Sequence, residues 1–161
     1  MSKSTQPKIY IVEDDVPMNE LLCQFLDMQG YNDVKGFYTG EDMMNELNNN
    51  QEIIIIQDFD LPGMNGLDIL GKVLPAFPKV EFIFLSGQSN IETAVEAIKG
   101  GAFDYIVKDK FAKENVQTKI NNLLKIKSLY KQKARLKKAF IYLAFITFIS
   151  WIIIFFLISL N

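Results

Sequence analysis

The chain of 161 residues contains no histidine and only one cysteine. Without histidine, the protein has no histidine general base, no histidine phosphocarrier and no histidine metal ligand. A single cysteine excludes an intramolecular disulfide and any zinc site built from several cysteines. Cys23 lies on an apolar helical stripe with Leu22 and Leu26, where it is expected to be a small core residue.

Acidic residues are almost missing from the C-terminal part of the chain. Residues 112–161 hold one glutamate and nine lysines or arginines, whereas residues 1–111 hold 18 acidic residues and eight lysines. An acidic body argues against nucleic acid as a partner. The basic tail indicates instead an anionic surface, such as membrane lipids.

Residues 139–160, "AFIYLAFITFISWIIIFFLISL", contain no charged side chain. As a helix this run would measure roughly 33 Å, compared with about 30 Å for the hydrocarbon core of a bilayer. It is predicted to be a transmembrane helix. The alternative is a buried oligomerisation helix, but an all-round apolar helix needs a larger protein around it.

The flank before this run, residues 125–138, carries seven basic residues and no acid. The positive-inside rule places such a flank in the cytoplasm, where it can also contact anionic lipid headgroups. The globular part is therefore expected to face the cytoplasm from a single span in a bacterial inner membrane. Residues 1–6 are expected to be a short polar leader and not a signal peptide.

The body alternates between patterns typical of strands and helices. Strands are predicted near residues 8–12, 32–37, 53–57, 80–85 and 103–107, with helices near 16–29, 40–49, 65–74 and 89–99 and from 112 onward. Five such units predict an α/β fold with a doubly wound, five-stranded parallel sheet. The last helix has no evident stop before residue 139. Its broken apolar seam can support a weak dimer, and a solvated helix that lies against the membrane is an equal alternative.

The stretch "IIIIQDFDLPG", residues 53–63, is a buried-strand pattern that ends in acids. Other predicted strands end at Glu13 and Asp14, at Ser86 and at Lys108. Because the carboxyl ends of parallel strands meet at one edge, these groups are expected to share a pocket with Asp58. Clustered carboxylates favour a divalent cation, and oxygen ligands with an incomplete shell suit Mg²⁺.

At four places, in order and at the expected spacing, the sequence resembles the receiver domain of bacterial two-component response regulators. These places are "IYIVEDD" at 9–15, "IIIIQDFDLPGMNGLDIL" at 53–70, "FIFLSG" at 82–87 and "GGAFDYIVKDKF" at 100–111. The resemblance covers residues 7–124. It implies a flavodoxin-like receiver fold, and a histidine kinase or phosphotransfer protein as phosphodonor.

The resemblance also implies roles for particular residues. Asp58 accepts the phosphoryl group, Lys108 stabilises charge during transfer, and Ser86 hydrogen-bonds a phosphoryl oxygen afterwards. Tyr105 fits the switch aromatic that responds to Ser86.

The resemblance further implies a Mg²⁺ site. Its ligands are the carboxylates of Glu13, Asp14 and Asp58 together with the backbone carbonyl of Asp60, while Asp15 is expected to cap the first helix.

Two features depart from the family pattern. Asp109 stands where a cis proline usually follows the lysine, so a trans peptide or a rearranged loop is expected. Gln57 is a polar residue within an apolar strand. An Asp58-x-Asp60 phosphatase of the haloacid-dehalogenase type is a weaker alternative, because Leu61-Pro62-Gly63 follows and the acid pair lies upstream.

The interpretation that follows is a membrane-anchored, single-domain receiver that is not an enzyme, apart from its own phosphorylation and dephosphorylation. After the receiver-like region the sequence offers only the basic helix and the apolar run, so the output is expected to be contact with a protein partner. A phosphorylation-independent scaffold and a phosphate sink or relay remain alternatives.

Overall fold

The structure is a computed structural model that describes residues 7–48, 51–87 and 91–159. The predicted leader, residues 1–6, lies outside the described residues. The chain divides into two compact units, Met1–Asn121 and Asn122–Asn161.

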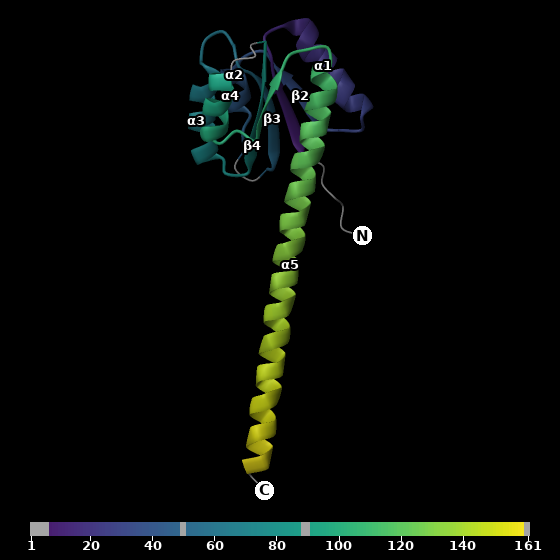
Figure 1. Ribbon diagram of the computed structural model, residues 1–161, viewed down its shortest axis with the longest axis vertical. Helices are drawn as coiled ribbons and strands as arrows, with labels where there is room; N and C mark the ends of the chain where they lie inside the picture. Colours follow the sequence, from purple (N-terminus) through teal and green to yellow (C-terminus); the bar gives the residue numbers. More distant parts are fainter. Residues whose placement is uncertain (1–6, 49–50, 88–90, 160–161) are drawn as a thin grey trace. The chain divides into compact units, whose positions relative to one another are not determined.

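Strands and helices alternate along the first unit, as the sequence predicts (Figure 1). The strands are β1 (Lys8–Val12), β2 (Val34–Phe37), β3 (Ile53–Asp58), β4 (Val80–Ser86) and β5 (Asp104–Val107). The helices are α1 (Val16–Met28), α2 (Gly40–Asn45), α3 (Gly66–Ala76), α4 (Ile91–Lys99) and α5 (Ala112–Ser159).

The five strands form one parallel sheet in the order β2-β1-β3-β4-β5. The predicted five-stranded parallel fold is thus confirmed. The order reverses direction between β1 and β3, and open α/β sheets bind ligands at the carboxyl edge beside such a switch point. Registers such as Val12 with Gln57, and Asp58 with Leu85, bring the ends of β1, β3 and β4 to this edge.

Side-chain caps fix where the first helices begin. The Asp15 carboxylate accepts a hydrogen bond of 2.8 Å from the backbone N–H of Met18, which confirms its predicted capping role. Thr39 caps α2 through the backbone N–H of Asp42 at 3.1 Å. Helix α2 ends at Asn45, and its predicted end at residue 49 lies outside the described residues.

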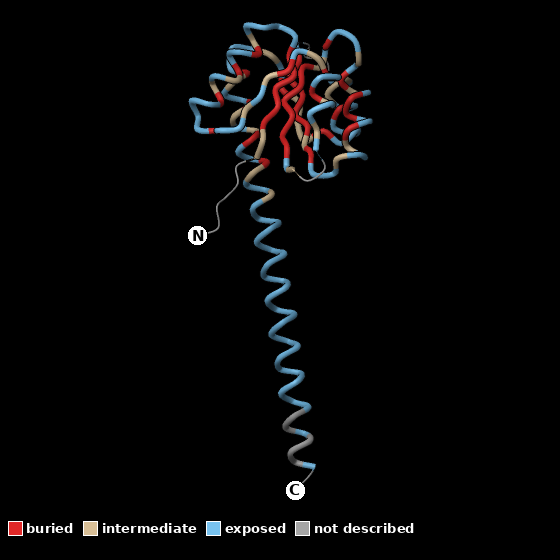
Figure 2. The backbone as a smooth tube through the Cα atoms, turned by 180° about the vertical axis from the view of Figure 1, so that it is seen from behind, coloured by how far each residue is buried: buried red, intermediate tan, exposed pale blue. Residues whose placement is uncertain are grey.

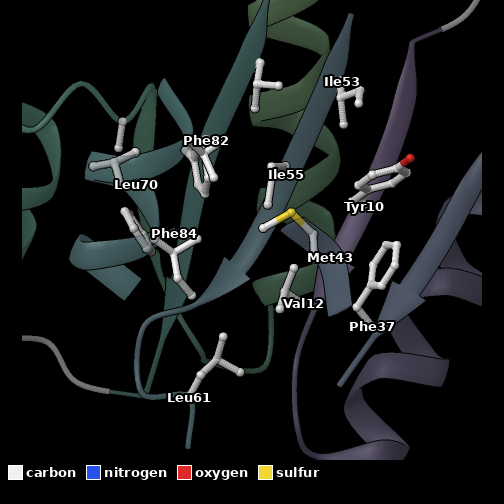
Figure 3. Close-up of a cluster of buried hydrophobic side chains, with 14 of the residues drawn as sticks. Tyr10, Val12, Phe37, Met43, Ile53, Ile55, Leu61, Leu70, Phe82 and Phe84 are labelled. Atoms are coloured by element: carbon white, nitrogen blue, oxygen red, sulfur yellow. The ribbon is translucent and has the colours of Figure 1, made fainter. Parts of the chain in front are cut away.

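Both faces of the sheet are buried, and the strands form the most buried part of the chain (Figure 2). On one face, β-strand residues such as Ile55 and Phe84 pack with Met43 of α2 and Leu70 of α3 (Figure 3). Side chains alternate between the faces, so Ile54 and Ile56 lie on the opposite side. This burial on both faces explains why β3 is continuously apolar up to Gln57.

The predicted span, residues 139–160, is helical as far as Ser159. Among the residues that the structure describes, no helix has both the length and the apolar character needed to cross a membrane. Residue 160 and several side chains of the run lie outside the description. The transmembrane helix is therefore not confirmed and stays a prediction.

Gln57 is completely buried, and neither its amide nitrogen nor its amide oxygen has a hydrogen-bond partner in the structure. It lies in the strand register between Val12 and Phe84. A Cβ atom on Gly66 would come within 3.1 Å of the amide nitrogen, so glycine allows the first turn of α3 to pack closely there. A buried polar group without partners lowers stability, because it has lost its hydrogen bonds with water.

We expect Gln57→Met to raise the free energy of unfolding by about 1 kcal/mol, since methionine fills a similar volume without buried polar atoms. Urea unfolding of a fragment of residues 1–126, followed by circular dichroism, measures this change. The control is Gln24→Met at an exposed position of α1, which should leave stability within about 0.5 kcal/mol. A clear loss of stability in Gln57→Met would show that the amide is hydrogen-bonded in solution.

Candidate functional site

Three charged side chains from three strand ends meet at the carboxyl edge of the sheet. Lys108 follows β5, and its Nζ donates hydrogen bonds to Asp58 Oδ2 at 2.6 Å and to Glu13 Oε1 at 2.8 Å. Glu13 and Asp58 are buried, whereas the Lys108 side chain is 22% exposed. The lysine therefore neutralises two carboxylates that would otherwise repel each other in a partly dry environment.

Asp14 completes an acidic cluster with Glu13 and Asp58. Each of the three can offer a carboxylate oxygen, and these oxygens lie within 4.8 Å of one another. Asp14 is exposed, so the cluster opens to solvent. Mg²⁺ prefers such a site, with a few carboxylate ligands and room to keep its waters.

A further observation supports the fit to a cation. Glu13 Oε2 is buried and has no hydrogen-bond partner, although it lies 2.7 Å from Lys108 Nζ. That contact is an ion pair. A buried carboxylate oxygen with an unused lone pair is suited to metal coordination, and the residues present therefore fit Mg²⁺.

Burial dominates the electrostatics of Glu13. Loss of hydration raises the pKa of its carboxyl group to about 7, against the opposing effect of the hydrogen bond from Lys108. For Lys108, burial acts to lower the pKa, but hydrogen bonds to Asp58 and Glu13 outweigh it and the pKa is raised. The lysine thus keeps its positive charge next to Asp58 at neutral pH.

Asp60 contributes to the site through its backbone. Its N–H donates to Asp58 Oδ1 at 3.2 Å, which holds the loop after β3 against the strand end. Its side chain is exposed, and its carboxylate is not part of the acidic cluster among the described residues. Coordination of a metal by the Asp60 carbonyl stays a prediction.

Ser86 and Tyr105 lie on the β4 and β5 side of the site. Ser86 is fully buried and comes directly after Leu85, which is the register partner of Asp58. The Ser86 carbonyl accepts a hydrogen bond of 2.7 Å from the backbone N–H of Lys108. Tyr105 is partly buried, and its ring makes an edge contact with Phe59 at 6.2 Å between centroids. The role of Ser86 and Tyr105 as a switch pair stays a prediction.

The peptide after Lys108 is trans, as expected for an aspartate at this position, since the described residues contain no cis peptide bond. Asp109 then caps the turn into α5, where its Oδ1 accepts the Phe111 N–H at 2.8 Å. The substitution of the usual proline has therefore not displaced Lys108 from its two carboxylates.

Sequence reasoning missed Asn19, which supports the site from α1. Its Nδ2 donates to the carbonyl of Glu13 at 3.0 Å and to the carbonyl of Phe37 at 2.8 Å, and thereby ties the ends of β1 and β2 together. Its Oδ1 accepts the Cys23 thiol at 3.6 Å. The available signal was a polar residue on the same helical stripe as Leu22 and Leu26.

The chain matches the response regulator receiver domain over residues 9–121, and it belongs to this family. It therefore contains the receiver domain of a two-component response regulator.

Two curated relatives illustrate the match. The C4-dicarboxylate transport transcriptional regulatory protein DctD of Rhizobium meliloti is 31% identical over 115 residues, which are 71% of this chain and 25% of that protein. The luminescence regulatory protein LuxO of Vibrio campbellii is 32% identical over 124 residues, which are 77% of this chain and 27% of that protein. The chain thus spans about a quarter of the length of these relatives.

Solved structures agree with this assignment. A CheY-like receiver domain protein from Methanospirillum hungatei superposes with a TM-score of 0.70 at 25% identity, and covers 78% of this chain and 99% of that one. The response regulator DrrB of Thermotoga maritima gives a TM-score of 0.67 at 27% identity, and covers 76% of this chain and 54% of that one.

The raised pKa of Glu13 predicts a pH dependence of stability in the absence of Mg²⁺. The carboxyl pKa is about 7 in the folded protein and near its ordinary value of 4.5 in the unfolded chain, so the folded state binds this proton more tightly. The stabilisation of the folded state by this proton is fully present below pH 4.5 and is lost as the pH rises through 7. We expect the free energy of unfolding to fall by about 2 kcal/mol over this interval.

Urea unfolding of the fragment of residues 1–126, at a series of pH values in EDTA, measures this fall in the free energy of unfolding. Glu13→Gln should remove the decline in the free energy of unfolding. Asp14→Asn, at the exposed neighbour, should leave the decline in place. An equal decline in the wild type and in Glu13→Gln would contradict the raised pKa.

Proposed function

We propose that the protein is a Mg²⁺-dependent phosphoacceptor that receives a phosphoryl group on Asp58 from a histidine kinase or phosphotransfer protein. The observation that carries this proposal is the contact of Lys108 with both Asp58 and Glu13 within the acidic cluster. The protein is a signalling domain and not an enzyme for external substrates, apart from its own phosphorylation and dephosphorylation.

The charges of the site suit this reaction. A carboxylate oxygen of Asp58 attacks phosphorus, a new O–P bond forms, and the bond from phosphorus to the leaving group breaks. Lys108, held protonated by its two carboxylates, lies 2.6 Å from Asp58 Oδ2 and faces the negative charge of the incoming group. When bound, Mg²⁺ would be held by Glu13, Asp14, Asp58 and the carbonyl of Asp60, and it would neutralise phosphoryl oxygens.

We expect the full chain in mild detergent, mixed with Mg²⁺ and acetyl phosphate, to gain the mass of one phosphoryl group. Acetate leaves as the Asp58 acyl phosphate forms. Intact-mass spectrometry measures the adduct, which should vanish in EDTA and in Asp58→Asn. The matched control is Asp60→Asn, which keeps the backbone carbonyl and N–H and should still be phosphorylated.

An adduct that persists in Asp58→Asn, or that does not require a divalent cation, would contradict the proposal. Loss of the adduct in Asp60→Asn would assign chemistry to that carboxylate and favour a phosphatase-like site. If Asp58→Asn also leaves partner binding and phenotype unchanged in cells, a phosphorylation-independent scaffold would replace the signalling role.

We further propose that residues 139–160 anchor the protein in the bacterial inner membrane, with the receiver domain on the cytoplasmic side. The support is the uncharged run in the sequence and its exposed apolar side chains, which include Phe140, Leu143, Phe148, Trp151 and Phe155. Large contiguous apolar surfaces of this kind mark contacts with membranes or proteins. The seven basic residues of 125–138 favour the cytoplasmic leaflet as the adjoining surface.

We expect the full chain in bacterial cells to sediment with the membrane fraction, to resist extraction by alkaline carbonate and to dissolve in detergent. Burial of the apolar run in lipid is the physical reason. A shortened chain that ends at residue 138 is the control and should stay in the supernatant. Release of the full chain by carbonate would contradict the anchor without affecting the phosphorylation result.

Signal output is proposed to be phosphorylation-dependent contact with a protein partner. The relatives DctD and LuxO are named as regulatory proteins, and this chain matches about a quarter of each. That match supports a regulatory role for this chain. The identity of the partner is left to experiments such as affinity capture with wild type and Asp58→Asn.

A further inference from the structure

The second unit, Asn122–Asn161, carries a seam of side chains spaced alternately three and four residues apart along α5. In chain order the seam contains Ile126, Leu129, Lys133, Leu136, Phe140, Leu143, Thr147 and Ser150. This spacing is the heptad pattern, in which positions a and d of a coiled coil face a partner helix. With Ile126 at a, Leu129 is at d, and five of the first six a and d positions, as far as Leu143, are apolar.

Apart from Lys133, Phe140 and Leu143, the residues of the seam differ in polarity from the segment around them. In the basic segment, residues 125–138, its members Ile126, Leu129 and Leu136 are apolar and exposed. In the uncharged segment that follows, Thr147 and Ser150 are small hydroxyl residues. Their hydroxyls donate to carbonyls of their own helix at 2.9 Å, so both present compact surfaces.

This inversion favours a helix as the partner over water or lipid. Exposure of the apolar seam residues of 125–138 to water is unfavourable. Contact of lipid tails with the hydroxyl residues Thr147 and Ser150 is not favoured over contact with apolar side chains. Packed helices in water bury leucine and isoleucine, whereas packed helices in membranes use small and hydroxyl residues that allow close approach. A partner helix must pass from a charged to an uncharged segment at the same level along the pair. A second copy in parallel orientation meets this requirement.

The basic residues are distributed as such a pair requires. Lys127, Lys131, Arg135 and Lys138 occupy positions b, f, c and f, which point away from a coiled-coil partner. An antiparallel pair would lay this basic segment against the uncharged residues of the other copy. Parallel pairing keeps the charged segments level with each other and directs these four charges outward.

The flanking positions also favour parallel pairing. In a parallel pair, position g of one copy faces position e of the next heptad in the other. Lys125 then faces Tyr130, and Gln132 faces Lys137, so no two lysines oppose each other at these positions. Lys125 can instead place its ammonium on the tyrosine ring.

Lys133 is the exception within the seam, since it occupies a central a position. Together with Ile126, Leu129 and Tyr130 it lines a groove of about 270 Å³ on this helix face. A single lysine at position a lowers the stability of a coiled coil but restricts its register and oligomeric state. Its stem covers apolar surface while its ammonium reaches solvent.

We propose that two copies of the chain pair in parallel along this seam, from Ile126 to Ser150, with Lys133 weakening the pair. The portion from Phe140 onward rests on the membrane anchor proposed above. The portion from Ile126 to Leu136 does not depend on it.

Disulfide scanning of the full chain tests the seam, because Cys23 is the only native cysteine and Cys23→Ser provides a clean background. Single cysteines are placed on the seam by Leu129→Cys, Leu136→Cys and Leu143→Cys. Matched outward controls at position f are Lys131→Cys, Lys138→Cys and Phe145→Cys. After oxidation of the cell fraction that contains the protein, dimers are measured on non-reducing gels.

We expect a several-fold higher dimer yield at the three seam positions than at their controls. Equal yields at the two sets would overturn the proposal, because random collision does not follow a heptad. In the same assay with the Leu129→Cys reporter, Lys133→Leu should raise the yield and Lys131→Leu should not. An unchanged yield in Lys133→Leu would likewise count against the seam.

The cross-linking result can be distinguished from failure of the membrane anchor and from failure of phosphorylation. If carbonate releases the chain while Leu129→Cys and Leu136→Cys still cross-link, the anchor fails and pairing in the basic segment is supported. Pairing is also scored without reference to phosphorylation of Asp58.

Discussion

The interaction on which the site depends is the contact of one lysine with two buried carboxylates. Lys108 Nζ lies within 2.8 Å of oxygens on both Glu13 and Asp58. Removal of the lysine would leave the two buried acids without a positive counter-charge in a poorly hydrated pocket, which is strongly unfavourable. Because the three residues lie at the ends of three different strands, the contact also ties together the carboxyl ends of β1, β3 and β5.

The sheet makes this arrangement possible, and the loops refine it. Parallel strands deliver their last residues to one edge, and the order β2-β1-β3-β4-β5 places β3 between β1 and β4. Asn19 then fixes the carbonyl of Glu13 to that of Phe37, and the Asp60 N–H fixes Asp58. Side chains held by backbone contacts of this kind are pre-organised to receive a cation and a phosphoryl group.

The two units of the chain follow different physical rules. The first unit buries the faces of a sheet, and its sequence shows strands and helices in alternation. The second is helical as far as Ser159, and its described large apolar side chains from Ile126 onward are exposed in the isolated chain. Such a surface is stable only with a lipid or protein partner.

Sequence alone determined the five strands and helices, and which strands end in polar or charged residues. It also determined the grouping of Glu13, Asp14, Asp58 and Lys108. These features depend on local periodicity and on the general geometry of parallel sheets, which are readable from spacing. The tertiary structure decided the isolation of the Gln57 amide, the bridge made by Asn19 and the raised pKa of Glu13. Each of these depends on burial and on contacts between segments distant in sequence, because dehydration and hydrogen-bond partners exist only once the strands have packed together.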